Sequence, residues 1–180
     1  MEISASAVKE LRDKTGAGIM DCRRALEQAE GDGTRAMEIL REKGLAHAKK
    51  VEGRTANQGL IETYIHAGGR IGAMVELNCE TDFVARTDQF RALAHDIAMQ
   101  VAATSPLYLT AAEAEAAGAP ADEAALLAQP FIKDARKNID DLVKETIAQI
   151  RENIVVRRFV RFEVGATEPP VTPPATDGTP

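Results

Sequence analysis

Few residues in this chain have the types and spacing that catalysis requires. Its three histidines, His47, His66 and His95, stand alone, without a carboxylate or thiol at the spacing of metal ligands. The sequence contains no GxSxG motif, no Walker motif and no GxGxxG motif after a predicted strand. A small enzyme whose site assembles from distant residues is an alternative without a supporting cluster. We therefore expect a binding protein that is not an enzyme and that holds no metal or cofactor of its own.

Composition argues against two classes of partner. The 180 residues carry a formal net charge of −6, whereas affinity for nucleic-acid backbones comes mainly from clustered Lys and Arg. No stretch reaches the roughly 20 apolar residues that a membrane-spanning helix needs. The two cysteines, Cys22 and Cys79, lie far apart and form no CxxC motif, a pattern typical of reduced thiols. We expect a soluble, cytoplasmic protein that contacts neither nucleic acid nor membrane directly.

Residues 1–52 predict a small head of three helices. Ser4 is a suitable N-cap for the first helix, which is expected to end near Gly16. Asp32 can cap the third helix, and Gly44 suits that helix's C-terminal end. The second helix carries one apolar stripe, formed by Cys22, Ala25, Leu26 and Ala29.

Residues 53–165 predict an α+β core. Alternating apolar residues indicate a strand ending at Cys79, which pairs with an earlier strand through a turn at Ala67-Gly68-Gly69. The remaining expected elements are a long helix over 87–104, helical segments around 110–118 and 121–128, a helix from Ile139 to Ile150 and a strand over 155–164. The predicted fold is therefore a helical head followed by a three-stranded antiparallel sheet packed with helices.

The last strand and the residues after it carry two further expectations. Alternation places Val156, Val160, Phe162 and Val164 on one face of the strand and Phe159 on the other. Residues 166–180 are rich in proline and poor in large apolar groups, so we expect a disordered tail.

Met20 departs from the pattern of ordinary packing. At about 100° per residue, its side chain lies about 160° from the centre of the apolar stripe of its helix. A large apolar side chain is therefore expected to face outward, with Ile19 at the edge of the stripe. Arg12 on the preceding helix could flank the same surface. Single exposed apolar residues are common, so an ordinary surface methionine is the competing interpretation.

The segment Thr81-Asp82-Phe83-Val84 is the second irregularity, between a strand and the long helix. If the helix began here, Phe83 would fall on its buried stripe, and this pattern slightly favours a core position. However, Arg86-Thr87-Asp88 carries a second helix-start signal, in which Thr87 or Asp88 can cap. Two signals six residues apart predict a short turn, a break and then the helix. Such a break would expose Phe83 on a connection, where binding residues often lie.

Four segments of the chain resemble the elongation factor Ts family: Val8–Arg12, Thr15–Cys22, Leu77–Arg86 and Val156–Gly165. Members of this family are guanine-nucleotide exchange factors for elongation factor Tu, the GTPase that delivers aminoacyl-tRNA to the bacterial ribosome. The resemblance implies that the head docks on that GTPase through Arg12, Ile19 and Met20. It also implies that Asp82 and Phe83, within Thr81-Asp82-Phe83-Val84, enter near the Mg²⁺ of the nucleotide, promote GDP release and so allow GTP to bind. On this reading Phe83 is an exposed wedge.

The chain differs from the longer members of this family in the number of core halves. Those members carry two related halves. This sequence has one hairpin, one Thr81–Val84 segment and one closing strand, so it resembles the short members. The missing contacts would then come from a second copy, and a symmetric homodimer is the economical arrangement. Phe159 offers a candidate apolar surface for it. The competing function is a non-catalytic adaptor, because the head resembles ubiquitin-associated domains.

Overall fold

The computed structural model describes residues 3–166, and the chain divides into two compact units. Of the described residues, the head unit contains 3–53 together with Lys144–Glu152, and the core unit contains Arg54–Val143 together with 153–166. Sequence reasoning did not place residues 144–152 with the head. The predicted tail, 166–180, lies outside the described residues except for Ala166.

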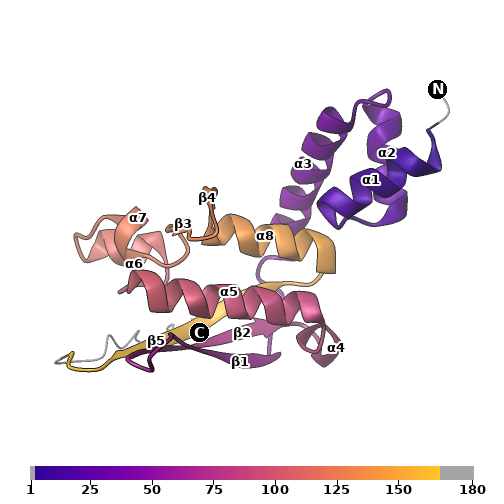
Figure 1. Ribbon diagram of the computed structural model, residues 1–180. Helices are drawn as coiled ribbons and strands as arrows, with labels where there is room; N and C mark the ends of the chain where they lie inside the picture. Colours follow the sequence, from indigo (N-terminus) through magenta and orange to yellow (C-terminus); the bar gives the residue numbers. More distant parts are fainter. Residues whose placement is uncertain (1–2, 167–180) are drawn as a thin grey trace. The chain divides into compact units, whose positions relative to one another are not determined.

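Three helices form the head: α1 (Ala5–Thr15), α2 (Ile19–Gln28) and α3 (Gly33–Val51) (Figure 1). The predicted caps are confirmed, since the Ser4 hydroxyl accepts from the Ala7 amide and the Asp32 carboxylate accepts from the Thr34 amide. The predicted stripe of α2 is also confirmed. The small core that it forms comprises Val8, Leu11, Cys22, Ala25, Leu26, Ala29 and Ala36.

The predicted end of α3 at Gly44 is wrong, because the helix continues to Val51. Gly44 is buried inside α3, and a Cβ built on it would lie 2.7 Å from the Cβ of Ala148. Ala148 belongs to α8 (Ile139–Ile150), in the part of that helix that joins the head unit. The glycine therefore permits close packing of two helices, a requirement that its neighbours in sequence do not reveal.

The core is built on an antiparallel sheet with the order β1–β2–β5: β1 (Gln58–Ile65), β2 (Ile71–Cys79) and β5 (Ile154–Glu163). Helix α5 (Asp88–Thr104) packs along one face of all three strands (Figure 1). The predicted hairpin turn is confirmed, and Gly68 and Gly69 adopt the positive φ angles of 90° and 68° that the turn requires. This layer buries Phe90 and Ile97 of α5 against Val75 and Leu77 of β2 completely.

The predicted faces of β5 are wrong beyond its midpoint. Glu76 pairs with Arg158 and Leu77 pairs with Val156, so Arg157 is an extra residue in β5, as in a β-bulge. One extra residue moves every later side chain to the opposite face. Phe159 is consequently buried, whereas Phe162 is 59% exposed.

Helix α4 (Asp82–Ala85) connects β2 to α5. The elements between α5 and β5 are α6 (Ala111–Ala116), α7 (Ala121–Ala124), β3 (Pro130–Phe131), β4 (Asp134–Asn138) and α8, whose first residues belong to the core. The helix expected over 121–128 ends at Ala124, and the β3–β4 pair was not predicted. Gln100, fully buried in α5, donates to the Pro130 carbonyl and accepts from the Ile132 amide. A side chain some 30 residues away in the chain thus holds this short hairpin, and local pattern cannot reveal such a contact.

We predict that Gly44→Val destabilises the head. The added Cβ would overlap with Ala148, and overpacking of this kind costs about 1–3 kcal/mol. Urea unfolding followed by helical circular dichroism measures the change. Gly33→Val is the matched control, because a Cβ at that helical glycine meets nothing within 4 Å. Equal unfolding midpoints for the two variants would contradict the packing role of Gly44.

Candidate partner-binding surfaces

The segment Thr81-Asp82-Phe83-Val84 forms a short capped turn directly after β2. The Thr81 hydroxyl accepts from the Val84 amide at 3.4 Å, which starts the four-residue helix α4. The chain then breaks, and the Thr87 hydroxyl accepts from the Phe90 amide at 3.3 Å, which starts α5. The predicted double start is confirmed, and Thr87 is the second cap.

This break places Phe83 in solvent. Its side chain is 82% exposed, whereas Phe90, one heptad later, is completely buried. The local pattern that favoured a core position for Phe83 is wrong, because α4 and α5 are not one helix and their faces need not align. An exposed phenyl ring forgoes roughly 1.5–3 kcal/mol of burial free energy. A ring held out on a connection in this way is a candidate contact for a partner.

Several contacts order the turn that carries Phe83. Asp82 forms an ion pair with Arg86, with 2.8 Å between Oδ2 and Nη2, and the Thr87 hydroxyl donates to the Val84 carbonyl at 2.8 Å. Ala85 is buried beneath the turn. The ring therefore projects from an ordered backbone, which lowers the entropic cost of binding a partner.

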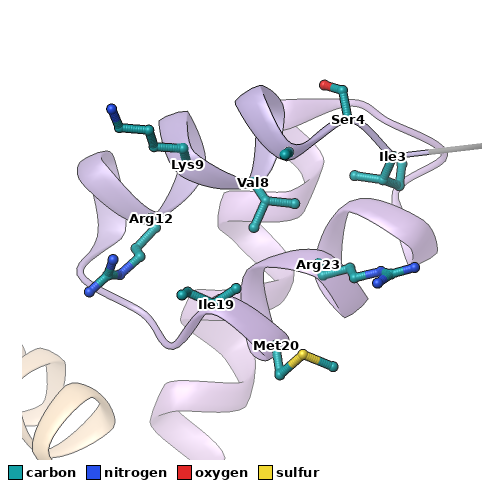
Figure 2. Close-up of a pocket in the computed structure, with 9 residues that line it drawn as sticks. Ile3, Ser4, Val8, Lys9, Arg12, Ile19, Met20 and Arg23 are labelled. Carbon is teal, nitrogen blue, oxygen red and sulfur yellow. The ribbon is translucent and has the colours of Figure 1, made fainter.

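The head presents a second surface, a groove of about 760 Å³ between α1 and α2 (Figure 2). Figure 2 shows Val8 pointing into the groove, with Ile19 and Met20 below it. Met20 and Ile19 are 60% and 56% exposed, which confirms the outward position predicted for Met20. Nine residues line the groove: Ile3, Ser4, Ala5, Val8, Lys9, Arg12, Ile19, Met20 and Arg23.

Charge at this groove is of one sign. Among the described residues, Lys9, Arg12 and Arg23 line it and no carboxylate does, although the whole chain has a net charge of −6. Arg23 pairs with Glu27 at 3.0 Å, whereas Lys9 and Arg12 form no ion pair within residues 3–166. The expected flanking position of Arg12 is confirmed. Sequence reasoning missed Lys9 and Ile3, which reach the groove only because α1 folds onto α2. Such a surface complements apolar side chains flanked by carboxylates.

The histidines make separate contacts. His95 forms a hydrogen bond with Glu62 at 3.0 Å, and His66 forms one with the Tyr64 hydroxyl at 3.3 Å. His47 forms one with a backbone carbonyl at 3.4 Å. Within residues 3–166, no three His, Cys, Asp or Glu side chains converge as a metal site. None of the helices described there has the length and apolar character needed to cross a membrane.

Cys22 and Cys79 are both buried, and no disulfide joins them. Burial raises the pKa of the Cys22 thiol above its usual range, which keeps this thiol protonated and poorly reactive. The head surface therefore owes its character to apolar and basic groups rather than to thiol chemistry.

Fold and surfaces together define an α+β protein with a helical head and an exposed aromatic turn. The family model for elongation factor TS matches residues 24–119. A protein named elongation factor Ts from Carboxydothermus hydrogenoformans is 50% identical over 91% of this chain and 89% of its own length. Its counterpart from Coprothermobacter proteolyticus is 48% identical over 92% of this chain and 100% of its own length. The chain belongs to the elongation factor Ts family.

We predict that Phe83→Ala and Phe90→Ala differ sharply in their effect on folding. Removing the exposed ring of Phe83 should change the free energy of unfolding by less than about 0.5 kcal/mol. Removing the buried ring of Phe90 should cost about 3–5 kcal/mol. Denaturant unfolding of the two purified variants measures both values. A large loss of stability in Phe83→Ala would mean that the ring packs against the protein.

Proposed function

We propose that this chain is a guanine-nucleotide exchange factor that binds elongation factor Tu with GDP bound and promotes release of the GDP. It makes and breaks no covalent bond, and it works in the cytoplasm, where translation elongation takes place. The observation that carries the proposal is the 82% exposure of Phe83 on a capped turn, within a segment that resembles the family's contact with the Mg²⁺ site. Family membership supports the identity of the partner.

The wedge acts on the coordination of Mg²⁺ in the GTPase. In P-loop GTPases this ion bridges phosphate oxygens to protein ligands. Mg²⁺ requires nearly octahedral geometry at about 2.0–2.1 Å, so a displacement of its surroundings by about 1 Å weakens it sharply. Insertion of the Phe83 ring between packed elements of the GTPase would cause such a displacement. Direct coordination by Asp82 is disfavoured, because that carboxylate is already paired with Arg86.

Thermodynamic linkage limits what such a factor can do. If this chain weakens the affinity of the GTPase for GDP, GDP must weaken the affinity for this chain by the same factor. The same argument applies to GTP. The chain therefore accelerates exchange in both directions, and the cellular excess of GTP sets the direction.

The head provides affinity through a different surface. Ile19 and Met20 offer exposed apolar area, and Arg12 and Lys9 offer positive charge beside it. We propose that this groove docks on the GTPase domain against apolar side chains with acidic neighbours. Because the groove lies on the head and Phe83 lies on the core, docking and wedging are separable functions.

Kinetics of GDP release separate the two roles. We expect Phe83→Ala to lower the maximal stimulated release rate by about tenfold or more. Each tenfold decrease in rate corresponds to a loss of about 1.4 kcal/mol of transition-state stabilisation. Met20→Ala should instead raise the half-saturating concentration with little change in the maximal rate. Fluorescent GDP bound to elongation factor Tu, mixed with increasing concentrations of each variant, provides both values.

Leu107→Ala is the matched control. Leu107 belongs to the core unit, its side chain is 52% exposed, and it lies on neither proposed surface. If Phe83→Ala changed the half-saturating concentration and the maximal rate equally, Phe83 would be ordinary binding surface. If the unaltered chain bound the GTPase without accelerating release, the adaptor function would replace exchange.

We also propose that the working unit is a homodimer, formed through the sheet face opposite α5. Phe159, the surface suggested by sequence, cannot serve because it is buried. The face opposite α5 instead presents apolar side chains that no described helix covers: Ile61, Ile65, Met74, Val160 and Phe162. One ion pair, Glu76 with Arg158 at 2.6 Å, lies among them. A second copy offers the same apolar set, so a two-fold axis would bury both faces at once.

Light scattering tests the dimer. We expect the unaltered chain to scatter at twice its mass of 19.4 kDa and Phe162→Glu to scatter at the monomer mass. A carboxylate placed among these apolar side chains would be buried in the dimer without a partner, which costs several kcal/mol. Leu107→Glu is the control and should remain dimeric. If the unaltered chain were a stable monomer that accelerates GDP release fully, the proposal of a homodimer would be ruled out.

A further inference from the structure

We infer that Arg86 is a positioning residue for the wedge, which neutralises Asp82 so that the turn can enter an anionic site. The inference rests on the proposed function. Arg86 lies one helical turn after Asp82, and the ion pair between them spans α4 from end to end. Phe83 follows Asp82 directly, so the pair and the ring approach any partner together.

The charge distribution along this part of the chain singles out Arg86. It is the only Lys or Arg between Ile71 and Phe90, a stretch that contains the carboxylates of Glu76, Glu80, Asp82 and Asp88. Two of these are neutralised by cations from elsewhere in the core: Glu76 pairs with Arg158, and Glu80 pairs with Arg54. Asp82, beside the exposed ring, pairs with Arg86 instead.

Stability of the free protein does not explain this pair. The side chains of Asp82 and Arg86 are 52% and 75% exposed, and exposed pairs of this spacing add little to the free energy of unfolding. The pair gains importance when the turn leaves water. GDP keeps a net negative charge even with Mg²⁺ bound, and a bare carboxylate brought beside its phosphates would be repelled more strongly as solvent is excluded. A paired carboxylate presents no net charge.

A second arrangement gives Arg86 a different role. The guanidinium could leave Asp82 and bind a phosphate or a carboxylate of the partner directly. In that case the effect of losing Arg86 would not depend on the charge at position 82. In the arrangement that we infer, it depends on that charge entirely. A double-mutant cycle therefore separates the two arrangements.

The test compares Arg86→Gln, Asp82→Asn and the double variant in the GDP-release assay with elongation factor Tu. We expect Arg86→Gln to raise the half-saturating concentration by about fivefold at low salt, because the unpaired Asp82 is repelled as the turn approaches the phosphates, and by less at high salt. The maximal rate should also fall, but by less than in Phe83→Ala, because the ring is retained. The double variant should bind like Asp82→Asn alone, and Arg86→Lys should restore most of the loss. Arg91→Gln, an exposed cation on α5, controls for net charge.

Independent, multiplicative effects of the two single substitutions would overturn the inference and assign Arg86 to a direct contact. Amide hydrogen exchange in the free chain adds a readout that needs no partner. Loss of the pair should speed exchange at Ala85 and Arg86 about twofold, with no change in the unfolding midpoint. If the unaltered chain failed to accelerate GDP release, the proposed function would fail. If amide hydrogen exchange in α4 were the same in Arg86→Gln as in the unaltered chain, Arg86 would have no positioning role. This outcome does not depend on the GDP-release assay.

Discussion

The break between α4 and α5 is the constraint on which the rest of this protein depends. Two threonine hydroxyls, six residues apart, each accept from an amide that would otherwise lack a partner, so the chain starts a helix twice. A single helix would have carried Phe83 onto the buried stripe with Phe90. Starting again at Thr87 lets Phe90 enter the core while Phe83 stays outside. The exposed ring is thus a consequence of hydrogen-bond capping rather than of its own chemistry.

An irregularity of the backbone also decides which side chains each face of the sheet presents. The extra residue at Arg157 turns Phe159 inward against α5 and turns Phe162 outward. One face of the sheet becomes the core, and the other keeps a set of apolar side chains in solvent. Several exposed apolar side chains on one sheet face are typical of an interaction surface, which is why we propose a second copy as the partner. The wedge and the sheet face therefore both arise where regular structure is interrupted.

The two surfaces proposed to contact the GTPase differ in chemistry, as the separate roles proposed for them require. The head groove combines exposed apolar side chains with basic side chains, a combination that favours encounter and affinity. The α4 turn carries a ring and a neutralised carboxylate, a combination that can enter a crowded, charged site. Placing them on separate compact units allows binding energy from one surface to support a displacement made by the other.

Features that depend on neighbours in sequence were predictable: the caps at Ser4, Asp32 and Thr87, the stripe of α2 and the outward position of Met20. The resemblance to a family was carried by such short segments as well. What the sequence alone could not determine depends on contacts between distant residues. Gly44 faces Ala148, Gln100 holds the β3–β4 hairpin, and the bulge at Arg157 is defined only by its pairing with β2. Capping and periodicity are local properties of a chain, whereas close approach and strand register exist only between segments, so the tertiary structure decided them.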